Sequence, residues 1–465
     1  MFTSLSFICF LFPITLFIYY FVPKQFRQIV LLIASILFLM GMGVFCFIFY
    51  LVITFINYIC SKIIFKLKRK NHKTGWIVWF QILLFTAVLY FWHNIDIIFL
   101  FGKEYSLSNF FPIGISFVAL QCIEYSLELQ KNQSSPIKYF HEYMLFVLFF
   151  PHLLRGPIYS YKSYCQMQRT TLSMKNEQIN MFQIIQGIEL FIYGLAKKLL
   201  LSDKLGFFLE TIRNQSDSDK SMFSAWLSMI AFGLQLYYEF SGYADMAEGL
   251  AYCFGYKLPK SYRFPMFSDS LSSFSNRWNI TAFKLFGKDF SSVFKNGKIF
   301  SAMLCVMIAF ILIGAWYGMK LTYLLWGVWI GVCICIESII KLKISISNKI
   351  LGTIWTVFVL TVSWAFFSSD NLTDAFNQLF LMFGGTDKVL QKEDLHFIRT
   401  GGILLLLGIF FSTEYVVILK NNIEKYKIGS NCMIFFRAVV SMFLFLICIS
   451  YMITDSENIG FLMKM

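Results

Sequence analysis

Charged residues are scarce in this sequence of 465 residues. Asp, Glu, Lys and Arg make up 14% of it, whereas hydrophobic types make up 58% and aromatic types 19%. The mean hydropathy is +0.65. A soluble domain carries about 25% charged residues. The composition therefore excludes an ordinary soluble protein and predicts an all-α polytopic membrane protein, with length enough for about ten or more spans.

Other missing features narrow the class further. The first apolar segment, residues 5–22, lacks a basic region and a small-residue cleavage site, so we interpret it as a span rather than a signal peptide. The 11 cysteines form no C-x-x-C pair with histidine partners, so we predict neither a metal site nor a disulfide framework. The net charge of +14 lies in short loops between spans, which is typical of positive-inside bias and not of nucleic-acid binding.

Apolar runs predict about 11–13 helices and half-helices within one integral membrane domain, residues 1–465. The runs lie at 5–22, 28–43, 44–61, 76–92, 109–127, 139–161, 181–201, 223–255, 297–317, 321–341, 349–367, 402–419 and 432–454. The basic loop 62–75 is predicted to be cytoplasmic, which leaves the N-terminus outside. Residues 372–383 are predicted to form an interfacial amphipathic helix, and residues 385–400 a polar connector.

Polar residues concentrate in the middle of the chain, between long apolar segments. An otherwise membrane-like run contains four polar residues within a stretch of ten: Glu239, Ser241, Asp245 and Glu248. Ser241, Asp245 and Glu248 share one helix face at spacings i, i+4 and i+7. Carboxylates at membrane depth are costly unless they face a protein interior or a water-filled cavity. We therefore expect the helices to surround a central polar funnel or tunnel.

A second polar interruption lies at residues 149–157, where His152 and Arg155 stand among two prolines and a glycine. One interpretation is a helix end at the membrane interface with a snorkelling arginine. The other is a re-entrant turn that lines the funnel. The sequence does not separate the two.

Four blocks of sequence resemble the membrane-bound O-acyltransferase family. They are PIGISF at 112–117, FPHLLRGPI at 150–158, GLAKK at 194–198 followed by DKL at 203–205, and YEFSGYADMAEGL at 238–250. The resemblance covers roughly residues 5–340 and does not include the spans in 349–454. It is strongest to bacterial alginate O-acetylases and to proteins that D-alanylate teichoic acids. It implies a ring of tilted helices around a tunnel, in which a cytoplasmic acyl donor meets an acceptor from the other side.

The chain departs from this family at its two histidine positions. The block RWNIT at 277–281 carries Arg277, Trp278 and Asn279, with Asn279 where bacterial relatives have histidine. The block GAWYG at 314–318 carries Trp316 and then Tyr317, where the catalytic histidine is expected. The resemblance thus makes Tyr317 and Asn279 the candidate catalytic positions, and makes Arg277, Trp278 and Trp316 candidate lining residues.

These replacements change the chemistry that can be expected. Acyl transfer to a hydroxyl needs a base for its proton and donors for the tetrahedral oxyanion. A phenol titrates near 10, so only about one in a thousand is ionised at pH 7, and Tyr317 is a poor base. An asparagine amide can still orient a group or donate to an oxyanion. A substitute base could come from His152 or from one of the carboxylates Glu239, Asp245 and Glu248, although each of these could instead be structural. A buried ion pair between Asp245 and Arg277 is a further structural hypothesis.

Two functions remain open. The first is an O-acyltransferase that moves an acetyl or similar group to an exported polysaccharide or other envelope hydroxyl. Its donor would be a cytoplasmic thioester, acetyl-CoA or an acyl carrier, with no bound cofactor. The second is a catalytically silent relative that serves as acyl channel or partner-binding scaffold. Membrane lipid surrounds the protein in either case, in the inner or plasma membrane, and the resemblance implies a periplasmic or extracellular esterase-like partner or a cytoplasmic acyl carrier.

Overall fold

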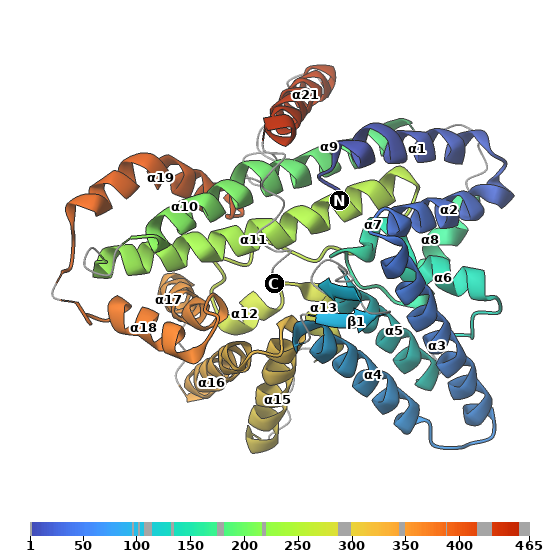
Figure 1. The fold of residues 1–465 in the computed structure, drawn as a ribbon, viewed down its shortest axis with the longest axis horizontal. Helices are drawn as coiled ribbons and strands as arrows, with labels where there is room; N and C mark the ends of the chain where they lie inside the picture. The colour runs from blue at the N-terminus through green and yellow to red at the C-terminus, as the bar shows by residue number, and fades with distance from the viewer. Residues whose placement is uncertain are drawn as a thin grey trace. The chain divides into compact units, whose positions relative to one another are not determined.

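The computed structural model describes residues 2–94, 97–100, 103–106, 114–131, 134–173, 181–215, 220–286, 299–343, 349–386, 388–415 and 430–454. These residues form two compact units. The first contains 1–193 and 243–260, and the second contains 194–242 and 261–465. Helices α9 and α11 each contribute residues to both units. The sequence prediction of helices throughout is confirmed, apart from one short hairpin (Figure 1).

The first unit consists of helices from the N-terminal part of the chain and the end of α11. Its elements are η1 Phe7–Leu11, α1 Phe12–Phe21, η2 Lys24–Phe26, α2 Arg27–Met40, α3 Val44–Arg69, α4 Gly75–Asn94, β1 Ile97–Leu100, β2 Lys103–Ser106, α5 Ile115–Gln130, α6 Phe140–Leu148, α7 Phe150–Leu153, α8 Tyr161–Ser173 and most of α9 Met181–Ala196. The two strands pair antiparallel, Ile97 opposite Ser106.

Two of the sequence blocks meet inside this unit. Gly114, in the first block, has φ +93, and a Cβ there would lie 2.4 Å from the carbonyl oxygen of Leu153 in the second block. Only glycine tolerates both that backbone conformation and so close an approach. The end of α7 therefore packs directly against the start of α5, and Pro151 stands in the first turn of the short helix α7.

The second unit contains the rest of α11 and all later helices. Its elements are η4 Lys197–Ser202, α10 Asp203–Arg213, α11 Met222–Cys253, α12 Leu271–Ser275, α13 Ile280–Phe286, α15 Ile299–Tyr317, α16 Leu321–Lys343, α17 Lys349–Phe367, α18 Leu372–Met382, α19 Lys392–Phe411 and α21 Ser430–Thr454. Its apolar core is built mainly from α10, α11 and α15–α17.

Helices α15 and α16 lie side by side (Figure 1) and pack tightly because a glycine on each helix faces the backbone of the other. A Cβ on Gly314 would lie 2.3 Å from the carbonyl oxygen of Tyr323, and one on Gly327 would lie 2.3 Å from that of Phe310. Small residues at such crossings let membrane helices approach closely. This contact fixes the end of α15, where Tyr317 is the last helical residue.

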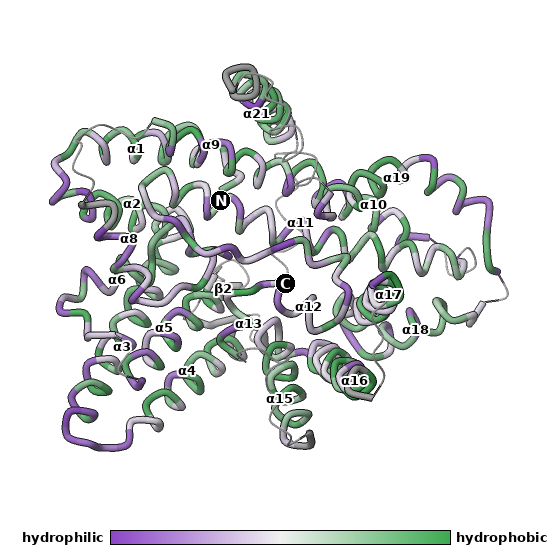
Figure 2. Tube along the Cα trace, turned by 180° about the vertical axis from the view of Figure 1, so that it is seen from behind, coloured by the Kyte–Doolittle hydropathy of each residue, from purple (hydrophilic) through white to green (hydrophobic). Residues whose placement is uncertain are grey.

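Five of the described helices are long and apolar enough to cross a membrane: α3, α16, α17, α19 and α21. Shorter apolar helices occupy 7–21, 75–90 and 301–317. Figure 2 shows their apolar colouring and the hydrophilic turn between α3 and α4. Helix α21 is only 11% buried over its apolar window, as expected for a lipid-facing span. The protein is therefore a multi-pass membrane protein.

Two sequence predictions need correction. Residues 392–400, predicted as part of a polar connector, form the first half of α19, because Asp394 accepts the backbone N–H of Gln391 at 2.7 Å and caps the helix. Residues 62–69, predicted as loop, continue α3, whose last turn carries basic side chains that suit a helix C-terminus. The predicted amphipathic helix is confirmed as α18.

Candidate functional site

The two blocks that carry the family's histidine positions meet at one hydrogen bond. The indole Nε1 of Trp278 donates to the hydroxyl oxygen of Tyr317 at 3.0 Å. Trp278 lies just before α13 and is buried, and Tyr317 ends α15, 39 residues later in the chain. The candidate catalytic position Tyr317 and the candidate lining residue Trp278 therefore belong to one site in the second unit.

Aromatic rings surround the Tyr317 phenol. They come from helices α11, α15, α16 and α17, at centroid distances between 4.9 and 6.0 Å: Trp316 at 4.9 Å, Phe367 at 5.2 Å, Trp326 at 5.7 Å and Phe240 at 6.0 Å. Most of these contacts are edge-to-face, the geometry that aromatic quadrupoles favour. The ring positions are thus set by four separate helices, and the phenol is held in a largely apolar environment.

Asn279 shows two signs of a functional position. Its side chain is 2% exposed, yet its Nδ2 has no hydrogen-bond partner among the described residues. Its backbone has φ +39, in the left-handed region that non-glycine residues rarely adopt. A buried donor without a partner and local backbone strain are both costly, and both concentrate at functional sites.

The polar stretch of α11 contributes a second buried group. Ser241 is 1% exposed, and its hydroxyl has no partner among the described residues. It lies one helical turn after Tyr237, whose ring is 6.3 Å from that of Trp278. This face of α11 is therefore the one turned toward the RWNIT block.

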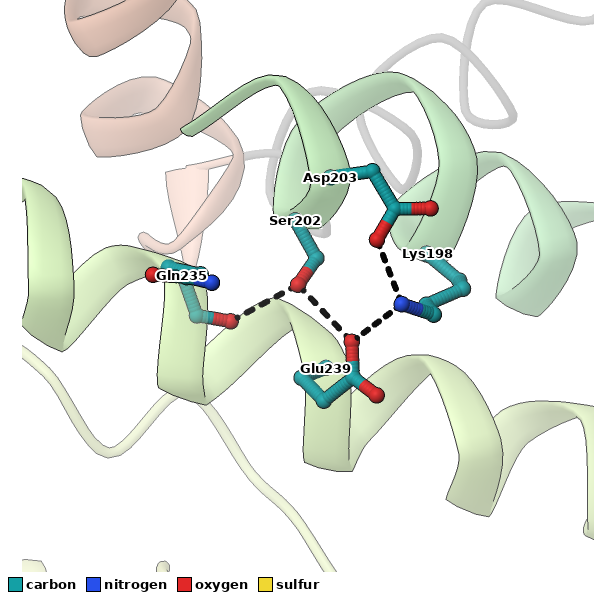
Figure 3. Close-up of polar contacts among 5 residues, drawn as sticks. All are labelled: Lys198, Ser202, Asp203, Gln235 and Glu239. Atoms are coloured by element: carbon teal, nitrogen blue, oxygen red, sulfur yellow. Dashed lines mark hydrogen bonds and ion pairs between the residues drawn. The ribbon is translucent and has the colours of Figure 1, made fainter. Parts of the chain in front are cut away.

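A buried ionic cluster lies on the neighbouring face of α11 (Figure 3). The Lys198 ammonium contacts the Glu239 carboxylate at 2.8 Å and also the Asp203 carboxylate. The Ser202 hydroxyl lies 3.0 Å from Glu239 and 3.1 Å from the carbonyl oxygen of Gln235, and can donate to one of them at a time. Lys198 and Ser202 stand on the π-helical segment η4, an irregularity that often marks functional sites.

The cluster contains one cation and two carboxylates. The Lys198 and Glu239 side chains are 7% and 4% exposed, while Asp203 is 39% exposed. Burial of this kind is tolerated only when charges are paired and hydrogen-bonded. Sequence reasoning placed Glu239 in the funnel but missed Lys198, although the GLAKK block contained it. Among the described residues, no group of His, Cys, Asp or Glu could hold a metal ion.

Arg277 has a different partner from the one considered from the sequence. Its guanidinium contacts the Glu414 carboxylate, just after α19, and its side chain is 33% exposed. The hypothesis of a buried pair between Asp245 and Arg277 joins residues of different units and stays a prediction, while the structure pairs Arg277 with a half-exposed carboxylate. Exposed pairs of this kind contribute little to stability.

The remaining predicted site residues lie in the first unit. His152 is buried, and its Nε2 lies 3.3 Å from the carbonyl oxygen of Phe146. Arg155 stacks over the ring of Tyr243 at 5.7 Å. Asp245 is half-buried and Glu248 buried, both on α11. His152 thus resembles a structural histidine tied to its own turn.

These features define a class: a multi-pass helical membrane protein with a buried aromatic site that brings together a Trp–Asn pair and a tyrosine at a helix end. The sequence profile of "MBOAT, membrane-bound O-acyltransferase family" matches residues 51–372. That match covers well over half of the chain. The chain belongs to the membrane-bound O-acyltransferase family.

Several named relatives share moderate identity with the chain. A probable alginate O-acetylase of Pseudomonas aeruginosa is 26% identical over 426 residues, covering 87% of this chain and 79% of the relative. A peptidoglycan O-acetyltransferase of Helicobacter pylori is 28% identical over 304 residues, covering 59% and 57%. A teichoic acid D-alanyltransferase of Streptococcus thermophilus is 25% identical over 258 residues, covering 52% and 60%.

Proposed function

We propose that this protein is an O-acyltransferase that moves an acetyl or similarly small acyl group onto an exported polysaccharide or other envelope hydroxyl. The relatives named as acetylases and acyltransferases act on alginate, peptidoglycan and teichoic acid, all envelope or exported polymers. The donor in this proposal is a cytoplasmic thioester, acetyl-CoA or an acyl carrier. The protein would act in the inner or plasma membrane.

One observation carries the proposal. The two family histidine positions lie in blocks that are far apart in the sequence, and the Trp278–Tyr317 hydrogen bond joins those blocks. The bond holds the phenol of Tyr317 beside the RWNIT block, as a shared site for acyl transfer requires. The unpartnered amide of Asn279 supports the same conclusion, because it offers a donor for an acyl oxygen.

A silent scaffold is the second candidate. The replacement of an imidazole by the phenol of Tyr317 favours it, because loss of a general base costs typically about 10²–10⁴-fold in rate. In that function the chain would serve as an acyl channel or would hold an esterase-like partner outside the membrane. Both candidates share the predicted orientation, in which the basic segment 62–75 lies in the cytoplasm.

The two candidates differ in their dependence on a single hydroxyl. Cells that lack the chain are complemented with wild type, Tyr317→Phe or Tyr323→Phe, and ester-linked acyl groups on envelope polysaccharide are quantified after alkaline release. Tyr323 is the matched control, since its ring also contacts Phe367 but it lies one helix later. An acyltransferase predicts ester loss with Tyr317→Phe alone. Full ester content with Tyr317→Phe, together with loss on deletion, would favour the scaffold.

A further inference from the structure

Helix α3 carries a stripe of exposed apolar side chains along most of its length. Five of them are between 39% and 51% exposed and recur every three or four residues: Ile48, Val52, Phe55, Ile59 and Ile63. That spacing places them on one face of the helix, while the buried residues Ile53, Asn57 and Ile64 lie on the opposite side. Because α3 is long and apolar enough to cross a membrane, this stripe is the face that contacts acyl chains.

The same face of α3 ends in cations. Lys66 and Lys70 continue the spacing of the stripe, and both side chains are exposed. At about 1.5 Å per residue, the stretch from Val44 to Lys66 is about 33 Å long, and the hydrocarbon core of a bilayer is about 30 Å thick. The two ammonium groups therefore belong at the level of the lipid headgroups. Figure 2 shows the hydrophilic character of this end of α3.

Residues 138–140 add a further cation and an aromatic ring beside α3. The Tyr58 hydroxyl and the Lys62 ammonium both donate to the carbonyl oxygen of Lys138, at 2.7 and 3.1 Å. The Lys138 ammonium lies 4.9 Å from the centroid of the exposed Tyr139 ring. Tyrosine is enriched at headgroup level because its ring is apolar and its hydroxyl is polar. Tyr139 therefore belongs at the same depth as the cations.

These cations have no carboxylate partner in the part of the chain that the structure describes. They are Lys62, Lys66, Lys70 and Lys138, and none of the ion pairs among the described residues includes one of them. Like charges that gather on one surface repel each other unless an anion lies among them. A soluble anion would supply that charge but would leave the apolar stripe uncovered. A lipid with an anionic headgroup supplies both the phosphate and the acyl chains.

We propose that the end of α3 and residues 138–140 form a binding site for an anionic phospholipid. The headgroup phosphate contacts Lys66, Lys70 and Lys138, and the acyl chains lie along the exposed stripe of α3. Each lysine near an anionic lipid strengthens binding about fivefold. The site lies entirely in the first unit, so it does not depend on the acyl-transfer function proposed for the site in the second unit.

Lipid preference is measured by native mass spectrometry of the purified full-length protein in a neutral detergent. Phosphatidylglycerol and phosphatidylcholine with identical acyl chains are titrated separately, and the fraction of protein that carries lipid gives an apparent Kd for each. Wild type should bind phosphatidylglycerol on the order of 100-fold more tightly, since three lysines contribute about fivefold each. The preference should shrink as salt is raised, because exposed charges are screened.

Two double variants locate the site. Lys66→Gln with Lys70→Gln should weaken phosphatidylglycerol binding about 25-fold and leave phosphatidylcholine binding unchanged. The matched control is Lys257→Gln with Lys260→Gln, which removes two exposed lysines from the same unit but not from α3. The control should keep the wild-type Kd for both lipids. All four side chains are exposed, so both double variants should fold, and thermal unfolding checks this.

Each outcome decides the inference. A preference for phosphatidylglycerol that only Lys66→Gln with Lys70→Gln reduces supports it. Equal Kd values for the two lipids, or equal weakening by the two double variants, would overturn it. Free glycerol phosphate that bound as tightly as phosphatidylglycerol would also overturn it, because the acyl chains would then contribute nothing. Binding of an acidic acyl carrier protein at these lysines, without a preference for phosphatidylglycerol, would assign the surface to a protein partner instead.

Discussion

Removing Lys198 should destabilise the second unit much more than neutralising Glu239. Lys198→Met leaves the Glu239 carboxylate 4% exposed, with the Ser202 hydroxyl as its remaining contact in the cluster. Removing one partner of a buried pair typically costs about 3–5 kcal/mol. Glu239→Gln keeps the shape and the Ser202 contact, and leaves Lys198 paired with Asp203. We expect that variant to lose only about 1 kcal/mol.

The difference in stability between Lys198→Met and Glu239→Gln is measured by thermal unfolding of the purified variants in one detergent, with tryptophan fluorescence as the signal. The double variant Lys198→Met with Glu239→Leu supplies the control, because it also replaces the carboxylate that Lys198→Met leaves buried without its lysine. It should recover most of the stability lost in Lys198→Met. If Glu239→Gln lost as much stability as Lys198→Met, the cluster would not be the buried charge pair described here.

Two further changes test other parts of the fold by the same unfolding assay. Gly233→Ala should cost about 1–3 kcal/mol, because its Cβ would lie 2.0 Å from the Trp364 ring; a neutral result would mean that these helices separate easily. Asp370→Asn should cost under about 1 kcal/mol, since its 2.7 Å bond to Lys320 is largely exposed; a larger loss would contradict that exposure.

The class of the protein followed from the sequence. Composition and apolar runs predicted a helical membrane protein because a bilayer requires long uncharged segments. The motif blocks named the region of Trp278 and Asn279 together with Tyr317 as candidate site positions, and in the structure Trp278 lies within a 3.0 Å hydrogen bond of Tyr317. The helical spacing of Ser241, Asp245 and Glu248 was also correct, since all three lie on α11.

Tertiary partners could not be predicted in the same way. The pairing of Lys198 with Glu239, and of Arg277 with Glu414, joins residues that are distant in the chain, and no local pattern encodes such choices. The start of α19 was missed for another reason. The acidic residues of its first turn were interpreted as a connector, although Asp394 three residues after Gln391 is typical of a helix N-terminus.

The most direct test is transfer of labelled acetyl from acetyl-CoA to polysaccharide hydroxyls by the purified protein, comparing wild type with Tyr317→Phe and Tyr317→His. The account predicts that wild type turns over and that Tyr317→Phe is slower by on the order of 100-fold with a similar KM. Turnover by Tyr317→His alone would contradict it, because the natural protein would then be a silenced acyltransferase whose site still accepts an imidazole.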